Sequence, residues 1–144
     1  MTAATSADLK TIARRWNEEF FNASGSIEAA HEFVAADFLD HSGPPWQPAG
    51  IAGVLWIANV FRTAFPDIYS NVEDVIVEGD KAVVRFTAGG THLGEFWGIP
   101  PTGKAGTTTG IHIFRIADGK IVEHWGNSDD MGLMQQLGVI PAMG

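Results

Sequence analysis

Apolar residues in the first half of the chain recur at spacings of three and four, as on the buried face of a helix. After Thr5 and Ser6, either of which can cap a helix, the first such face comprises Leu9, Ile12, Ala13, Trp16 and Phe20. After Ser26, a shorter repeat comprises Ile27, Ala30, Phe33, Val34 and, as a further candidate, Phe38. A third repeat, ended by Pro66, comprises Val54, Ile57, Ala58, Phe61 and Phe65. The pattern predicts three N-terminal helices.

From Asp67 onward the chain changes to runs rich in Val, Ile, Thr and Phe, which favour strands. The predicted strands are residues 72–78, 81–91, 107–117 and 120–128. Short turns between the first two and the last two predict hairpins, whereas the Gly-, Pro- and Thr-rich segment 94–106 predicts a long loop over one end of the sheet. Residues 131–137 predict a short C-terminal helix ended by Gly138. This order predicts an α+β fold, with helices packed on a curved antiparallel sheet, in one domain over residues 1–144.

Composition and charge restrict the classes of partner. Of the 144 residues, 45% are hydrophobic and only 18% are charged, so the chain has enough apolar material to fold. The formal net charge of -8 repels phosphate backbones and anionic lipid, so neither nucleic acid nor a membrane is expected as a partner. The absence of Cys excludes a disulfide scaffold and a thiolate nucleophile. Met1–Ser6 lacks the pattern of a secretory signal, so a cytoplasmic protein is expected.

Two histidines fall on strand faces where the pattern expects core residues. Alternation places His112 on the same face as Phe114, and a buried imidazole needs either a hydrogen-bond partner or a cavity. His124 shares a face with Gly126 on the following strand, which the tight hairpin at residues 118–119 brings alongside His112. The same short patch of sheet also contains Trp125, Asn127 and Asp129.

Further imidazole and aromatic groups lie in or near predicted loops, where binding sites are often built. The rigid Pro-rich loop 41–50 and the start of the long loop contribute His41, Trp46, His92, Phe96 and Trp97. Taken singly, each is more simply explained as an exposed loop residue or a core aromatic. The sequence contains no HxxxH, HxH or HxD spacing, so no metal site is predicted, and it lacks a nucleotide-binding fingerprint and a nucleophile elbow.

Several blocks, in order along nearly the whole chain, resemble the SnoaL-like polyketide cyclase (ester cyclase) family. They are Asp40-His41, Phe65-Pro66-Asp67, Gly90-Thr-His-Leu-Gly94, Gly98-Ile-Pro-Pro-Thr-Gly103, Phe114-Arg-Ile-Ala-Asp-Gly-Lys-Ile-Val-Glu-His-Trp125 and Leu133-Met-Gln-Gln-Leu-Gly138. The resemblance implies the cone-shaped α+β barrel of the nuclear-transport-factor-2-like superfamily, with three helices covering a strongly curved sheet around an apolar pocket. It also implies cofactor-free chemistry on a small hydrophobic or aromatic substrate, and a homodimer or higher homo-oligomer.

The resemblance further implies a mechanism and a departure from it. Cyclases of this family close a ring by intramolecular aldol condensation, with a carboxylate on the last strand as general acid and base and a histidine close by. The histidine matches His112, but the carboxylate position falls on Gly126. Glycine cannot transfer a proton and would enlarge the pocket, so we expect proton transfer by His112 with Asp129 or His124.

The expected substrate-binding residues are His41, Trp46, His92, Phe96, Trp97, Phe114, Gly126 and Asn127. Two other functions stay open at this point. One is a hydroxylase or hydrolase variant of the family. The other is a non-catalytic domain that binds a small molecule or serves as a dimeric scaffold, because a fold does not fix a function.

Overall fold

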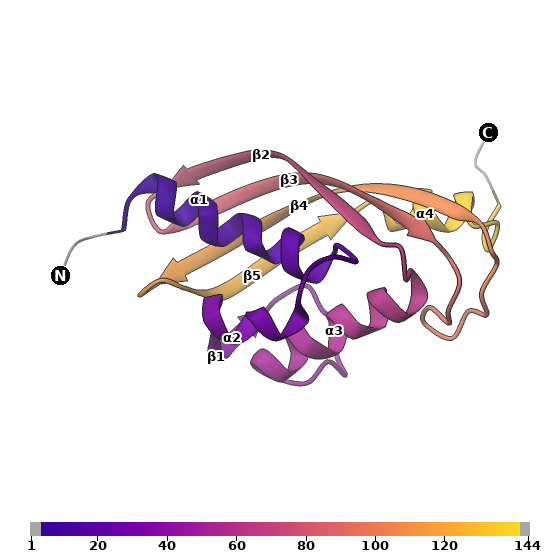
Figure 1. The fold of residues 1–144 in the computed structure, drawn as a ribbon, viewed down its shortest axis with the longest axis horizontal. Helices are drawn as coiled ribbons and strands as arrows, with labels where there is room; N and C mark the ends of the chain where they lie inside the picture. The colour runs from indigo at the N-terminus through magenta and orange to yellow at the C-terminus, as the bar shows by residue number, and fades with distance from the viewer. Residues whose placement is uncertain (1–3, 142–144) are drawn as a thin grey trace.

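The protein, described by a computed structural model over residues 4–141, packs helices against a curved five-stranded sheet (Figure 1). In chain order the elements are α1 (Ser6–Arg15), the π-helix η1 (Trp16–Phe20), the 3-10 helix η2 (Ile27–Ala29), α2 (Ala30–Phe33), β1 (Val34–Asp40), α3 (Ile51–Ala64), β2 (Tyr69–Glu78), β3 (Lys81–Thr91), β4 (Ala105–Ala117), β5 (Lys120–Ser128) and α4 (Asp130–Gln136). Within the described residues, no helix is long and apolar enough to cross a membrane. The prediction that residues 1–6 carry no secretory signal falls partly on residues 1–3, which lie outside the described residues.

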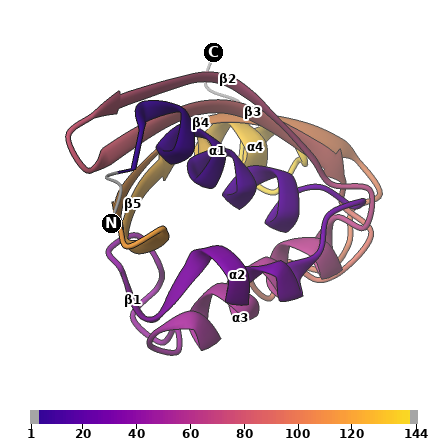
Figure 2. The same ribbon diagram turned by 60° about the vertical axis from the view of Figure 1, so that its left-hand side comes forward.

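The strand order in the sheet is β1-β5-β4-β3-β2. Strands β2 to β5 form an antiparallel meander, and β3 and β5 begin and end at the predicted residues. Figure 2 shows β2, β3 and β4 arching over α1, with α2 and α3 on the other side of α1 from these strands. The α+β prediction is therefore confirmed, with one strand more than the sequence pattern indicated.

The second predicted helix is wrong beyond Phe33, because the chain continues as the strand β1. This strand pairs parallel with β5 at the edge of the sheet, so the sheet is mixed rather than purely antiparallel. Its register shifts between Val34 and Leu39, because a step of five residues along β1 corresponds to a step of only two residues along β5. Val34 and Phe38 are both buried, whereas Ala36 between them is exposed, so the two-residue alternation of a strand fails at Ala36. The spacing of four residues between Val34 and Phe38 therefore imitates a helix.

The first helix begins with a capping box, in which Thr5 and Asp8 satisfy each other's backbone N–H groups. Its apolar face buries Leu9 and Ala13 and continues into the π-helix η1, which buries Trp16 and Phe20. A π-helix widens the turn and is found most often at functional sites. The helix thus delivers an indole ring to the main core, among residues from β3 and β4.

A long loop joins β3 to β4 as predicted, but it comprises residues 92–104 rather than 94–106. Its first residue, His92, is fully buried, and its Nδ1 accepts a hydrogen bond from the Thr102 N–H at 3.2 Å. This bond joins the two ends of the loop. Phe96 packs into a second apolar cluster with Phe65 and with Leu133 and Leu137, so the loop and the C-terminal helix are held together.

Candidate functional site

The hairpin of β4 and β5 brings the two predicted histidines together. His112 lies directly opposite Gly126, and Phe114 lies opposite His124, so the two imidazoles are diagonal neighbours on one face of the sheet. His112 Nδ1 and His124 Nε2 are 2.8 Å apart and share a hydrogen bond. Both residues are buried, with 9% and 4% of their surfaces exposed. The predicted pairing of these histidines is therefore confirmed by the strand register.

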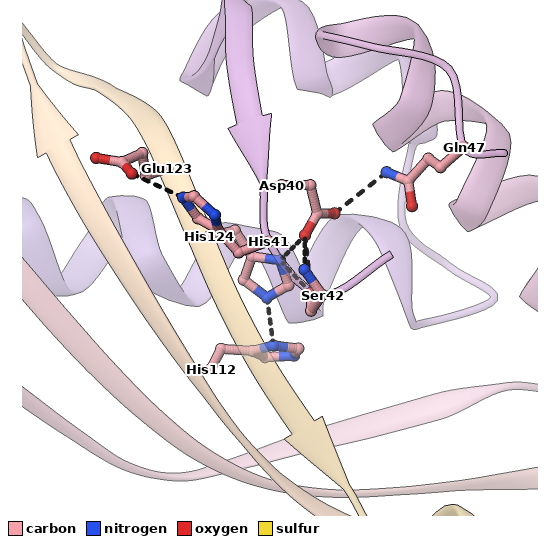
Figure 3. A network of polar contacts seen from close by, with 7 residues as sticks. All are labelled: Asp40, His41, Ser42, Gln47, His112, Glu123 and His124. Atoms are coloured by element: carbon pink, nitrogen blue, oxygen red, sulfur yellow. Dashed lines mark hydrogen bonds and ion pairs between the residues drawn. The ribbon is translucent and has the colours of Figure 1, made fainter. Parts of the chain in front are cut away.

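A carboxylate completes this pair from the edge strand (Figure 3). Asp40, the last residue of β1, lies opposite His124 in the parallel register, and its Oδ1 is 3.0 Å from His124 Nδ1. The same carboxylate accepts hydrogen bonds from the Ser42 N–H, the Ser42 hydroxyl and Gln47 Nε2, at 2.9, 2.8 and 3.2 Å. Asp40, His124 and His112 thus form a continuous hydrogen-bonded chain.

The chain of polar groups ends at a partly open cavity of about 440 Å³. His112, His124 and Asp40 line it, and most of its remaining wall is aromatic or otherwise apolar, including Trp16, Phe21, Phe61, Phe65, Phe86, Phe96 and Trp97. His112 Nε2 is buried and has no hydrogen-bond partner. An unsatisfied buried polar atom of this kind costs about 1–3 kcal/mol, so it favours a ligand that supplies the missing partner.

Burial and charge determine the protonation of the imidazole at the cavity wall. The His112 ring stacks on Phe86, with centroids 4.6 Å apart and an interplanar angle of 9°. Burial and, to a lesser degree, the charge of His124 lower the pKa of His112 well below 6.5, while Asp40 opposes this shift. The imidazole of His112 is therefore neutral at neutral pH and able to accept a proton.

The carboxylate of Asp40 has the opposite property. Burial tends to raise its pKa, but the hydrogen bond and charge of His124, together with the bonds from Ser42, outweigh burial and hold the pKa well below 3.8. A carboxyl group with so low a pKa is a poor proton donor or acceptor in catalysis. Asp40 is instead a fixed negative charge behind His124.

Acidification is expected to destabilise the fold through His112. Because its folded pKa lies below the unfolded value of 6.5, the unfolded chain binds a proton that the folded chain does not as the pH falls below 6.5. The free energy of unfolding therefore decreases with falling pH, by up to about 1.4 kcal/mol per pH unit for this proton. Urea denaturation at about pH 7.5 and about pH 5.5 measures the effect, which should be weaker in His112→Gln.

The other titratable groups facing His112 are His124 from β5 and, beyond it, Asp40 from β1. Asp40 acts in a lower range, because its stabilisation is present above 3.8 and is lost as the pH falls through its depressed pKa. The two contributions are therefore separable. Equal pH dependence of wild type and His112→Gln above pH 5.5 would show that His112 is not held neutral by the fold.

Among the other predicted site residues, four line the cavity: Phe96, Trp97, Gly126 and Asn127. Phe114 lies outside its wall and is fully buried, stacking on His124 with ring centroids 5.2 Å apart. His92 also lies outside the wall and holds the long loop instead. Trp46 is 68% exposed and does not line this cavity.

The structure does not bring Asp129 to the imidazole pair. This residue is exposed, lies outside the cavity wall and caps α4, where its carboxylate accepts a hydrogen bond from the Gly132 N–H at 2.9 Å. An Asp at this position satisfies a free N–H at the start of the helix. Its place at the end of β5 therefore has a local structural explanation.

His41 belongs to a different surface. Its ring stacks on Trp125, with centroids 4.8 Å apart and an angle of 9°, and its Nε2 donates to Glu123 at 2.8 Å. In Figure 3 the dashed line between His41 and Glu123 is separate from the dashed lines that join Asp40, His124 and His112. His41 does not line the cavity. The homodimer expected through the open face of the sheet stays a prediction.

Sequence reasoning missed Asp40, Ser42 and Gln47 as site residues. The block Asp40-His41 was available as a signal, because a charged residue directly follows the apolar pair Phe38 and Leu39. A helix prediction over this segment gave no reason to place Asp40 beside the last strand. The parallel pairing of β1 with β5 supplies that reason.

The whole arrangement matches known proteins. Residues 11–137 match the family described as SnoaL-like polyketide cyclase. The chain belongs to this family. Aklanonic acid methyl ester cyclase DauD of Streptomyces sp. (strain C5) is 32% identical over 111 residues, which are 75% of this chain and 66% of that protein. Aklanonic acid methyl ester cyclase DnrD of Streptomyces peucetius is 28% identical over 80% of this chain and 81% of its own length.

Solved structures show the same fold. TsrD from Streptomyces laurentii has a TM-score of 0.86 and 26% identity, covering 96% of this chain and 100% of its own. AclR from Streptomyces galilaeus, described as a candidate hydroxylase, has a TM-score of 0.82 and 26% identity, covering 97% of this chain and 87% of its own. The SnoaL-like chain therefore shares one architecture with relatives described in different chemical terms.

Proposed function

We propose that this SnoaL-like protein is a cofactor-independent cyclase that closes a ring in a polyketide-derived ester by intramolecular aldol addition, with His112 as the general base. The observation that carries the proposal is the buried imidazole of His112, a residue that lines an aromatic cavity and whose Nε2 has no hydrogen-bond partner. The relatives named as methyl ester cyclases, together with the aromatic lining of the cavity, indicate the substrate class, an aromatic methyl ester that closes a ring.

The reaction requires two proton transfers, one from carbon before the ring closes and one to the alkoxide oxygen afterwards. A hydrogen between two carbonyl groups is acidic, because the resulting enolate spreads its charge over both oxygens. A neutral imidazole is basic enough to remove it when the two atoms are held in contact. The enolate carbon then attacks the ketone in the same molecule, and the new alkoxide takes a proton from the imidazolium. No net proton, electron or cofactor is consumed.

The cavity supports the binding half of this proposal. Aromatic side chains from η1, from α3 and from the long loop line the same cavity as the imidazole pair and suit a planar ring system. Its volume of about 440 Å³ lies within the usual range for small-molecule sites. Water-poor walls also strengthen the interaction of a developing enolate with nearby donors.

The mass of the product tests the proposal against its alternatives. Purified protein, treated with a chelator and supplied with no cofactor, is incubated with aklanonic acid methyl ester, and the products are separated by liquid chromatography with mass detection. We expect an isomer of unchanged mass whose formation follows the protein concentration. A product heavier by one oxygen atom would support the hydroxylase alternative, and loss of the methyl ester would support a hydrolase. Tight binding without any product would indicate a non-catalytic pocket and overturn the proposal.

A further inference from the structure

The position opposite His112 explains how two imidazoles come to share a hydrogen bond. Diagonal residues on paired strands lie farther apart than directly opposed ones, so one ring must lean across its directly opposite neighbour to meet the other. That neighbour is Gly126. An ideal Cβ on Gly126 would lie 3.0 Å from His112 Nδ1 and 3.0 Å from His124 Nε2, which are the two bonded atoms. Any side chain at this position would press on both partners.

Gly126 lines the cavity, and its missing side chain also makes room for the two imidazole rings. The glycine has no positive φ, so its backbone conformation does not require glycine. The close approach of the two rings is what favours glycine at this position.

The hydrogen-bond partners determine where the protons lie along the chain. Asp40 is ionised, so its Oδ1 can only accept, and His124 Nδ1 must carry a hydrogen that it donates. When His124 is neutral, as the relay proposed below requires, its other nitrogen, Nε2, has a lone pair and accepts from His112 Nδ1. His112 is neutral as well, so its Nε2 has a free lone pair. The contacts thus present the basic nitrogen of His112 to the side that lacks a partner.

The outer end of the chain is firmly held. The Asp40 side chain is 11% exposed and that of His124 is 6% exposed. The His41 N–H donates to the His124 carbonyl oxygen at 2.9 Å, which fixes the backbone of β1 against β5 at this point. Three donors from Ser42 and Gln47 orient the carboxylate. An anion held in this way stabilises a positive charge on His124 more than a mobile one would.

We infer that Asp40, His124 and His112 form a two-imidazole proton relay that the absence of a side chain at Gly126 makes possible. The inference rests on the proposed function and deepens it, because it names the groups that allow His112 to act first as base and then as acid. Asp40 and His124 are positioning residues in this scheme, and only His112 contacts the reacting atoms.

The proton balance of the relay is as follows. His112 Nε2 takes the proton from the carbon acid, and the proton on His112 Nδ1 passes to His124 Nε2. The positive charge then rests on His124, beside Asp40, while His112 is neutral again and carries its hydrogen on Nε2. That hydrogen is donated to the alkoxide formed by ring closure, and the proton on His124 Nε2 returns to His112 Nδ1. Every group regains its starting state without exchange with solvent.

The relay is tested first without substrate, by nitrogen NMR of ¹⁵N-histidine-labelled protein at neutral pH. The expected signals are a protonated Nδ1 and an unprotonated Nε2 for both His112 and His124, assigned with His112→Gln and His124→Gln variants. His112 protonated on Nε2 in the resting protein would overturn the relay. Because this measurement needs no turnover, a positive result with no cyclisation would contradict the proposed function alone.

Two variants then test the relay during turnover. Gly126→Ala and Asp40→Asn are each expected to lower kcat roughly 10- to 100-fold with KM changed less than about threefold, because both residues line the cavity but the main effect of each change falls on the hydrogen bonds behind the base. In both variants the histidine NMR signals should move. Asp67→Asn is the matched control for Asp40, because Asp67 also accepts N–H and hydroxyl hydrogen bonds, from Thr91, but lies outside the cavity wall. Unchanged kcat in a folded Asp40→Asn or Gly126→Ala protein would overturn the relay.

Discussion

Replacing His112 by glutamine is expected to lower kcat/KM for the proposed ring closure by roughly 10²- to 10⁴-fold, the usual contribution of a positioned general base. Glutamine retains an amide that can hydrogen-bond to His124, but it cannot accept a proton from a carbon acid. The loss should therefore fall on kcat, with little change in KM. Steady-state kinetics on aklanonic acid methyl ester, monitored by product formation, measures both constants.

His41→Gln is the matched control for this substitution. His41 is a histidine of the same sheet region whose imidazole binds Glu123 and stacks on Trp125, outside the cavity. Its kcat/KM should stay within about threefold of wild type, as expected for a residue without transition-state contacts. Full activity in a folded His112→Gln protein would exclude His112 as the base and leave the cavity with a binding role.

The hairpin of β4 and β5 was predictable from sequence because of its two-residue turn. Asp118 and Gly119 adopt positive φ in the turn, as a tight connection between twisted strands requires. The register set by the turn holds only as far as Ile116, and a one-residue shift between Ile116 and Arg115 then places His112 and His124 on the same face. Local rules therefore predicted the hairpin that holds two of the three members of the chain of polar groups, but not the shift that turns both toward the same side.

The third member could not be derived in the same way. Asp40 reaches His124 through a parallel pairing between segments more than 80 residues apart, and no turn links the two strands. Periodicity also fails in β1, because Ala36 is exposed between the buried Val34 and Phe38 where the register is irregular. Long-range pairing of an irregular edge strand leaves no short-range pattern in the sequence.

The search for a carboxylate by sequence proximity led to Asp129, which follows the histidine strand directly. Proximity along the chain is a weak guide here, because β5 ends one residue earlier and the chain turns into α4. The residue at such a junction is an N-cap, and its side chain points back to the helix N–H groups. The carboxylate that contacts the histidines comes instead from a neighbouring strand, where pairing rather than sequence distance determines contact.

Trp16 is the residue whose truncation should destabilise the fold most. Its indole is 2% exposed and lies against Phe38 and Phe114 as well as both imidazoles, with its centroid 4.5 Å from that of His124. Trp16→Ala removes a large buried side chain and leaves a hole beside the cavity, so we expect the free energy of unfolding to fall by about 3–5 kcal/mol. Urea denaturation measures the change, and Trp16→Phe should lose less because a ring remains.

Trp46→Ala is the control, since Trp46 is 68% exposed and its loss should change stability by no more than about 0.5 kcal/mol. The comparison also tests the packing of the site, because the Trp16 indole packs against the His124 imidazole. A loosened indole wall should let the imidazole pair move, so the histidine NMR signals should broaden in Trp16→Phe while those of Trp46→Ala stay as in wild type. A loss below about 1 kcal/mol in Trp16→Ala would mean that the aromatic wall relaxes around the hole, and that the imidazoles do not depend on this indole for their position.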